Sequence, residues 1–244
     1  MCKVLKFSIF LISFVQLLFA QSSLHKNFDV LLKKNVRANG DVDYKGFIED
    51  STRLNEYLGM LSSNAPKTHW NENEIKAYWM NAYNAFTIQL VIRNYPIKSI
   101  KEIGGKIPFI NSTWDIKFIS IGNEILDLNN IEHGKLRKRY EDPRIHMALV
   151  CASVSCPALR NEAYDPKKLD TQLDDQSKRF LADPIRNNVN SKIAQLSMIF
   201  KWYKSDFNVV GGVREFVKKY GPSEISEKTK ISYMDYNWAL NSIK

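Results

Sequence analysis

The chain has 244 residues, of which 44% are hydrophobic and 25% are charged, with only 10 glycines, 8 prolines and 3 cysteines. These values are close to those of an average globular protein, so they exclude a disordered chain, a collagen, a coiled coil and a cysteine-stapled miniprotein. Lys and Arg number 35 against 26 Asp and Glu, which gives a formal net charge of +9. A moderate positive charge favours anionic partners or surfaces, but it does not specify a chemistry.

The first twenty residues have the pattern of a secretory signal peptide. Lys3 and Lys6 form a short basic start, an apolar run follows over 7–19, and the small Ala20 precedes Gln21. Polar residues interrupt the run, which is shorter than the roughly 20 apolar residues that a bilayer span needs; an uncleaved membrane anchor is the alternative. We therefore expect a soluble protein exported to the periplasm or the extracellular space, with a net charge of +7 once the two lysines have left with the signal.

The remaining residues, 21–244, are expected to form one domain in which helices and strands are mixed. Helical spacing of the apolar residues predicts an amphipathic helix within 24–36 and another over 44–61. The strongest pattern covers 72–93, where apolar side chains occupy nearly every direction of the helical wheel, as in a helix buried on all sides. Asn71 can cap the start of this helix.

After the central helix the pattern changes to one that is typical of strands. Residues 113–126 indicate a β-hairpin with a turn at Gly122-Asn123, and 127–139 indicate a short helix. The apolar run 145–150 predicts a compact strand that leads into a loop at Cys151. The last elements are expected to be helices over 166–182, 197–204 and 213–220 and strands over 189–196 and 231–236. The predicted fold class is α+β, with helices packed on a small, mostly antiparallel sheet and one long buried central helix.

Sequence motifs of several enzyme classes are missing. The chain has no dinucleotide glycine fingerprint, phosphate loop, Gly-x-Ser-x-Gly elbow, His-Glu-x-x-His or Cys-x-x-Cys. The sequence therefore gives no reason to expect a cofactor, and because the basic residues are scattered, we expect no binding to nucleic acid. Contact with a membrane is expected only through residues 1–20, if they are not cleaved.

Three motifs follow one another along the chain: Ala77–Ala85 (AYWMNAYNA), Asp127–Arg137 (DLNNIEHGKLR) and Asp142–Arg160 (DPRIHMALVCASVSCPALR). Together they resemble the DUF547 family, a domain of unknown function. The resemblance covers about 70–181, and a weaker part continues at 200–203 and 236–238. Members of this family are often exported bacterial proteins, and plant members carry the domain after a coiled coil. The resemblance therefore implies export, and it implies no activity.

Cys151 is the candidate nucleophile. It follows the predicted strand at a chain reversal, where loops commonly carry functional side chains. A cysteine nucleophile needs a base or a cation nearby to lower its pKa from about 8.5. We predict His133 as this base, because it shares a helix face with Arg137, whereas His146 lies on the opposite side of the predicted strand from Cys151. His146 is therefore expected to be structural.

A third group has to orient the imidazole of such a base. The candidates are Asn84, on the central helix, and Glu132, next to the predicted base. Asn81, Arg137 and Arg160 are candidates for binding substrate, the two arginines through bidentate contacts with a carboxylate. The alternatives are that the two asparagines bind loop carbonyls and that the arginines pair with local acids.

Cys151 and Cys156 are the only thiols left once residues 1–20 are removed. In an oxidising compartment they could form a disulfide that closes a small loop, or they could serve a redox function. With His133 and His146 they also match the ligand types of zinc, but their spacing matches no short zinc signature, so we expect no metal site.

Two functions of different classes are compatible with these features. The first is a thiol-dependent hydrolase or acyltransferase that acts on an amide, ester or peptide-like bond outside the cytoplasm. The second is a non-catalytic binding or scaffold domain in which Cys151 and Cys156 are structural or disulfide-linked. In both cases the expected ligand is a small molecule or a peptide-like compound, for which the two arginines favour a negative charge.

Overall fold

The chain combines many helices with two small sheets. The computed structural model describes residues 24–104 and 112–243, so the predicted signal segment 1–20 lies outside the described residues. The helices are α2 (Lys26–Asn35), α3 (Tyr44–Glu49), α4 (Ser51–Ser63), α5 (Glu72–Asn94), α6 (Ile145–Ala148), α7 (Leu169–Ala182), α8 (Ile199–Trp202) and α9 (Val213–Tyr220), with a π-helix over Asn130–Arg137 and 3₁₀ turns at Ile100–Glu102, Thr113–Asp115 and Lys204–Val210. The strands are β1 (Ile119–Ile121), β2 (Glu124–Leu126), β3 (Asn188–Val189), β4 (Ile193–Leu196) and β5 (Lys230–Tyr233).

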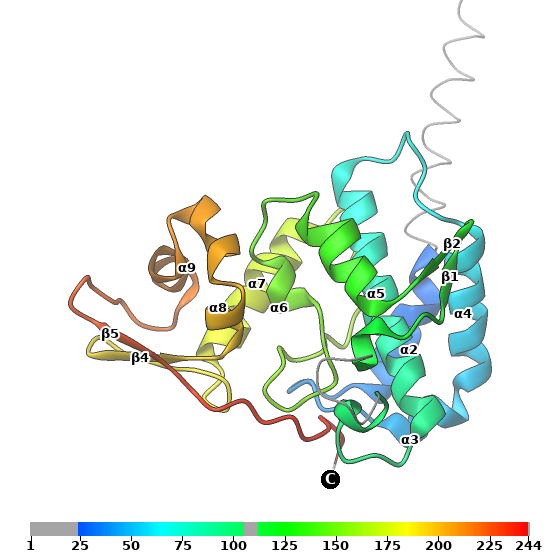
Figure 1. The fold of residues 1–244 in the computed structure, drawn as a ribbon, viewed down its shortest axis with the longest axis horizontal. Coiled ribbons are helices and arrows are strands. Elements are labelled where there is room, and N and C mark those ends of the chain that lie inside the picture. Colours follow the sequence, from blue (N-terminus) through cyan, green and yellow to red (C-terminus); the bar gives the residue numbers. More distant parts are fainter. Residues whose placement is uncertain (1–23, 105–111, 244) are drawn as a thin grey trace, which may run out of the picture.

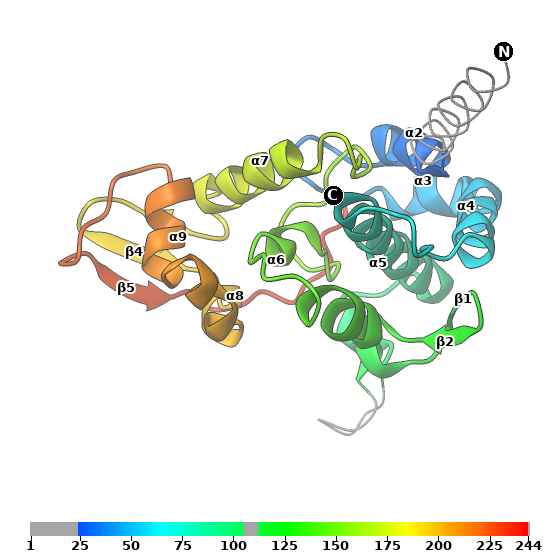
Figure 2. The same cartoon turned by 90° about the horizontal axis from the view of Figure 1, so that it is seen from above.

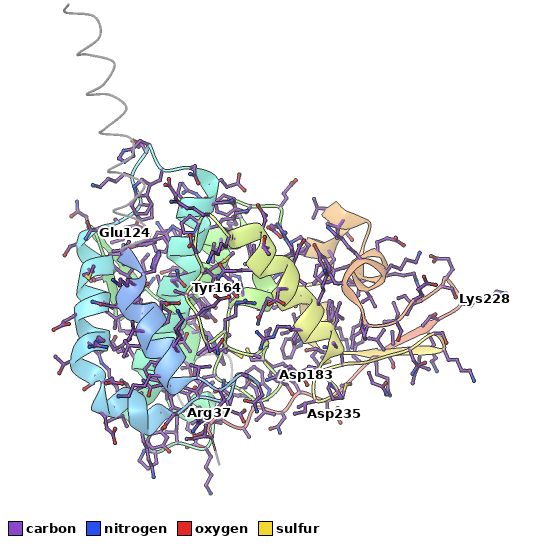
Figure 3. All side chains as sticks on the ribbon, turned by 180° about the vertical axis from the view of Figure 1, so that it is seen from behind. Arg37, Glu124, Tyr164, Asp183, Lys228 and Asp235 are labelled. Carbon is purple, nitrogen blue, oxygen red and sulfur yellow. The ribbon has the colours of Figure 1, made fainter. Side chains whose placement is uncertain are left out.

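The elements gather at two ends of an elongated molecule. Helices α2, α3 and α4 pack around α5 at one end, α8, α9 and the sheet of β4 and β5 form the other, and α6 and α7 lie between them (Figures 1 and 2). Seen from behind, the side chains of Glu124 and Lys228 mark the two ends (Figure 3). A large apolar core surrounds α5, and a smaller one that includes Phe200 and Phe216 fills the other end. Within the described residues, no helix has the length and apolar character needed to cross a bilayer.

The central helix α5 forms as its sequence predicts. Asn71 caps it, because its side chain accepts the backbone N–H of Glu74 at 3.0 Å while the Glu74 carboxylate accepts the N–H of Asn71 at 2.7 Å. Every side chain from 76 to 91 is buried, as expected for a helix that is apolar on nearly all sides. The helix ends one residue beyond the predicted end, just before Tyr95-Pro96.

The two sheets differ in topology. Strands β1 and β2 form the predicted antiparallel hairpin, in which Ile119 pairs with Leu126 and Gly122 makes the turn with a φ of +57°, a conformation that favours glycine. In the second sheet β3 pairs with β4 antiparallel, whereas β4 pairs with β5 in parallel. The predicted α+β class and the mostly antiparallel pairing are therefore confirmed, and the described strands form two separate sheets instead of one.

The predicted strand over 145–150 is wrong. Residues Ile145–Ala148 form one turn of α-helix (α6), and the backbone becomes extended only at Leu149. Asp142 favours this turn, because its side chain accepts the backbone N–H of Arg144 at 3.1 Å. A short apolar run suits a buried helical turn as well as a buried strand, so hydrophobic periodicity does not decide between the two.

After β5 the chain runs back across the molecule and ends beside α3 (Figure 1). On its way it pairs with the loop that contains the two cysteines: the N–H of Val154 donates to the carbonyl of Ala239 at 2.8 Å, and the N–H of Asn241 donates to the carbonyl of Ala152 at 3.2 Å. Val42, just before α3, donates its N–H to the carbonyl of Asn241 at 2.9 Å. The C-terminal segment therefore ties the cysteine loop to the larger core.

Candidate functional site

The candidate site is built around the loop 149–156, which follows α6. Asn84 in α5 holds the start of this loop with both ends of its amide: Nδ2 donates to the carbonyl of Ala148 and Oδ1 accepts the N–H of Val150, each at 3.0 Å. Because Asn84 is only 3% exposed, these two backbone groups have little access to water as an alternative partner. Asn84 therefore fixes the backbone directly before Cys151.

The chain reverses direction immediately after Cys151. Ala152 has a φ of 58°, in the left-handed region that residues with a side chain rarely adopt. The hydrogen bond from the N–H of Asn241 to the carbonyl of Ala152 helps to hold this conformation. Backbone strain of this kind concentrates at functional sites, and here it adjoins the candidate nucleophile.

Cys151 is partly exposed, and three possible hydrogen-bond donors surround its sulfur. Cys156 Sγ lies 2.6 Å from Cys151 Sγ, and the hydroxyl oxygens of Ser153 and Tyr236 each lie 3.3 Å from it. The hydrogen bond from Cys156 lowers the pKa of Cys151 most, and those from Ser153 and Tyr236 add to it, against the opposing effects of burial and of the negative charge of Glu132. Burial raises the pKa of Cys156, so Cys151 is the sulfur that ionises first.

Cys151 lines a pocket of about 330 Å³ whose walls come from both apolar cores. Glu132, His146 and Cys156 also line it. Six aromatic side chains, which we call the aromatic wall, form much of the remaining surface: Tyr83, Trp114, Trp202, Tyr203, Tyr236 and Trp238. A larger, open cleft of about 870 Å³ lies elsewhere, beside Arg144, but the residues that line it include no cysteine or histidine.

His146 lines the same pocket as Cys151. The sequence predicted a strand that would place the two side chains on opposite faces, but His146 lies in the helical turn α6. Its Nε2 lies 2.9 Å from the Asp206 carboxylate, and its ring stacks on that of Tyr203 with the centroids 4.1 Å apart. The hydrogen bond with His146, followed by that from Arg137, holds the pKa of Asp206 well below its usual range. A carboxylate only accepts hydrogen bonds, so Nε2 is the nitrogen that donates to Asp206, and in a neutral ring the lone pair would be on Nδ1.

Arg137 binds the same carboxylate as His146, that of Asp206. Its Nε and Nη2 donate to the two oxygens of Asp206 at 2.7 and 3.0 Å, and its guanidinium carbon lies 4.5 Å from the centroid of the Tyr203 ring. Burial raises the pKa of Tyr203, as do the negative charge of Glu132 and the hydrogen bond between these two side chains. Tyr203 therefore connects His146, Arg137 and Glu132.

The structure does not bring His133 to Cys151. The side chain of His133 is not among those that line the pocket, and its Nδ1 lies 2.8 Å from Nη1 of Arg137. The segment Asn130–Arg137 is wound as a π-helix. The predicted contact between His133 and Arg137 is formed, but Glu132 and not His133 lines the pocket, so His133 is not paired with Cys151.

Neither asparagine orients a histidine. Asn84 holds the cysteine loop, and Asn81 makes the same two contacts with Tyr164: Nδ2 donates to the carbonyl and Oδ1 accepts the N–H, both at 2.9 Å. Both amides thus bind loop backbone, which was the alternative to a role in catalysis or substrate binding.

The two arginines expected to bind substrate are bound to carboxylates of the protein. Arg137 is engaged by Asp206, and Arg160 forms ion pairs with Glu162 and, at 2.5 Å, with Asp175. Neither guanidinium is among the groups that line the pocket of Cys151. The structure therefore places both arginines in structural ion pairs.

The two cysteines are not bonded in this structure, with their sulfurs 2.6 Å apart, and the disulfide expected from the sequence stays a prediction. The backbone N–H of Cys151 donates to Cys156 Sγ at 2.8 Å, which holds the buried thiol close to the exposed one. Among the described residues, no group of three or more Cys, His, Asp or Glu side chains is arranged to hold a metal ion. The zinc ligand set considered from the sequence is not assembled.

Trp202, Tyr203, Asp206 and Tyr236 are among the residues of the site that were not predicted. The weaker part of the resemblance, at 200–203 and 236–238, marked three of them, but aromatic residues in such segments are also typical of a core. Asp206 lies outside both segments, and no local pattern pointed to it.

Residues 67–181 match the family model described as "Protein of unknown function, DUF547". This region of the chain is therefore similar to the DUF547 family. The resemblance predicted from the three motifs is confirmed, and the matched region includes Glu132, His146 and Cys151, whereas Asp206 and Tyr236 follow it in the chain. The comparisons with curated proteins and with solved structures gave no match. The matched region thus supplies the thiol, the histidine and Glu132, and the segments after it add Ile199 and four aromatic residues, Trp202, Tyr203, Tyr236 and Trp238, to the pocket.

Proposed function

We propose that the protein is a thiol-dependent hydrolase or acyltransferase acting on an ester, amide or peptide-like bond, with Cys151 as the nucleophile and His146 as the acid and base. The observation that supports it is a partly exposed thiol with a lowered pKa in the same pocket as a histidine whose Nε2 is held by Asp206. A thiolate is the form of cysteine that attacks a carbonyl carbon. His146 therefore takes the role that the sequence assigned to His133.

The reaction has two steps. His146 Nδ1 accepts the thiol proton, the Cys151 thiolate attacks the carbonyl carbon, and the bond to the leaving oxygen or nitrogen breaks while His146 returns the proton to that atom. This step leaves a thioester on Cys151. Water, or an acceptor alcohol or amine, then attacks the thioester while His146 takes its proton, and Cys151 leaves as a thiolate. Asp206 stabilises the imidazolium formed in each step.

The experiment is acylation of the purified protein by p-nitrophenyl acetate, an activated ester, followed by p-nitrophenolate release and by the intact mass. We expect a burst that approaches one p-nitrophenolate per protein and an acetyl group on Cys151, both lost in Cys151→Ala. His146→Gln should slow the burst at least about ten-fold, because general acid–base catalysis is worth about 10²–10⁴-fold. His133→Gln replaces a histidine outside the pocket and should slow it less than about two-fold.

Two results would contradict this function. One is a burst that persists in Cys151→Ala, and the other is an equal effect of the two histidine substitutions. A protein with no burst at all would instead support the alternative, a non-catalytic binding or scaffold domain in which the two cysteines are structural.

We also propose that the protein is exported to the periplasm or the extracellular space after removal of residues 1–20. The support is the order of a basic start, an apolar run and a small residue before Gln21. Fractionation of expressing bacteria and the mass of the recovered protein test this proposal. A chain beginning at Gln21 outside the cytoplasm is the expected result, and a chain that keeps Met1 or stays in the cytoplasm contradicts it.

A further inference from the structure

The pocket of Cys151 contains an acidic group, the carboxyl group of Glu132, with which no lysine or arginine of the described residues is in direct contact. Glu132 is 7% exposed, and within the described parts of the chain no lysine or arginine forms an ion pair with it. The positive charge of Arg137 is close enough to interact with Glu132, but its guanidinium is bound to Asp206. A buried carboxylate is unfavourable unless a cation or several donors compensate for it, and Tyr203 forms a hydrogen bond with Glu132.

The charged residues that line the pocket differ in sign from the net charge of the chain. Glu132 is the one acid among the described residues that line it, and none of these residues is a lysine or an arginine. The complete chain nevertheless has a net charge of +9. His146 is the one basic side chain among the described residues of the lining, and its Nε2 is bound to Asp206. The pocket is therefore a local site that favours positive charge on a basic protein.

The aromatic wall provides a surface that suits a cation. The face of an aromatic ring carries partial negative charge and attracts ammonium and guanidinium groups. Two rings of the wall already contact cations of the protein: Lys101 Nζ lies 4.8 Å from the centroid of Trp238, and the guanidinium carbon of Arg137 lies 4.5 Å from that of Tyr203. Trp202 is 46% exposed, so part of its ring is open to a ligand.

We infer that this pocket recognises an alkylated ammonium group on a small molecule, with Glu132 as the opposite charge and the aromatic wall as the apolar surface. The inference deepens the proposed function and rests on it for one point, that the ammonium group belongs to the molecule whose acyl group Cys151 attacks. An anionic ligand would be repelled by the carboxylate of Glu132 and by the Cys151 thiolate. A neutral ligand would leave the charge of Glu132 uncompensated.

The experiment compares choline with 3,3-dimethylbutan-1-ol, which has the same shape but a carbon atom in place of the ammonium nitrogen. Binding to the Cys151→Ala protein is measured by calorimetry and by tryptophan fluorescence, so the result does not depend on catalysis. We expect choline to bind at least about ten-fold more tightly than the alcohol, and Glu132→Gln to bring the two affinities within about three-fold. Glu56→Gln, which removes an exposed charge from α4, is the matched control and should leave the ratio unchanged.

The aromatic wall is tested separately with Trp202→Leu. This variant keeps an apolar side chain but loses the ring face, so it should weaken choline binding at least about three-fold and the binding of the alcohol less. In the wild-type protein, choline should also slow the alkylation of Cys151 by iodoacetamide, and this measurement requires no substitution.

Three results would overturn the inference: equal affinity for choline and the alcohol, a preference for choline that persists in Glu132→Gln, or no binding of choline. Failure of the inference and failure of the proposed function can be told apart. A protein that shows the acyl burst but does not bind choline keeps its proposed function and loses the ammonium site. A protein that binds choline without a burst keeps the site and loses the proposed function.

Discussion

Asn84 allows a sharp test of how the fold positions the thiol, because Asn81 on the same helix provides a matched control. The two side chains are 3% and 1% exposed, and each makes two hydrogen bonds to loop backbone. Asn84→Ala leaves the carbonyl of Ala148 and the N–H of Val150 buried without partners. At about 1–3 kcal/mol for each group, the free energy of unfolding should fall by about 2–4 kcal/mol once the loop has relaxed. Asn81→Ala removes the same pair of bonds from Tyr164 and should have a similar effect.

The two variants should differ at the nucleophile. Without Asn84 the loop is released and Cys151 loses its fixed position beside Cys156, the donor that lowers its pKa most, so the pH midpoint of its alkylation should rise. Asn81→Ala should leave this midpoint unchanged. Urea unfolding measures the stability of each variant, and mass spectrometry of the Cys151 peptide measures alkylation. A loss of stability under about 1 kcal/mol in Asn84→Ala, or equal midpoint shifts in both variants, would refute this account.

Three further predictions concern His25, Asp206 and Arg160. Burial lowers the pKa of His25 to about 3 from 6.5, so the unfolded chain binds a proton that the folded protein excludes, and stability should fall by about 1.4 kcal/mol per pH unit as the pH drops between these values. Urea titrations over this range should show a shallower pH dependence in His25→Gln, and identical slopes would contradict the prediction. Asp206→Asn should slow the acyl burst at least about ten-fold, because an amide can donate to Nε2 of His146 and favour the wrong tautomer; an unchanged burst would show that Asp206 does not position the ring. Arg160→Gln should lower the free energy of unfolding by about 2–3 kcal/mol and leave the burst rate unchanged, since its ion pairs are structural, and a slower burst in a stable variant would show otherwise.

Elements with strong local signals could be predicted from the sequence. The apolar pattern and the capping residue defined α5 to within one residue, and the turn at Gly122 defined the hairpin. Two predictions failed. A short apolar run did not distinguish a helical turn from a strand at 145–150, and in the segment Asn130–Arg137 Glu132 and not His133 lines the pocket.

The site itself could be predicted only in part. Cys151 and Glu132 do line one pocket, although Glu132 contacts Tyr203 and not the predicted base. The prediction that His146 is structural depended on the mistaken strand, which placed its side chain on the opposite face from Cys151. The contacts that define the chemistry, such as Tyr236 with Cys151 and Asp206 with His146, join distant parts of the chain, and no local pattern encodes them.

The central claim, that Cys151 is an activated thiol, is tested most directly by the rate of its alkylation by iodoacetamide as a function of pH. The account predicts a midpoint below the value of about 8.5 for a free cysteine. The midpoint should rise in Cys156→Ala, which removes the main donor, and stay low in Cys156→Ser, which keeps a hydroxyl in its place. A midpoint at or above that of a free cysteine, or one that Cys156→Ala leaves unchanged, would contradict the account.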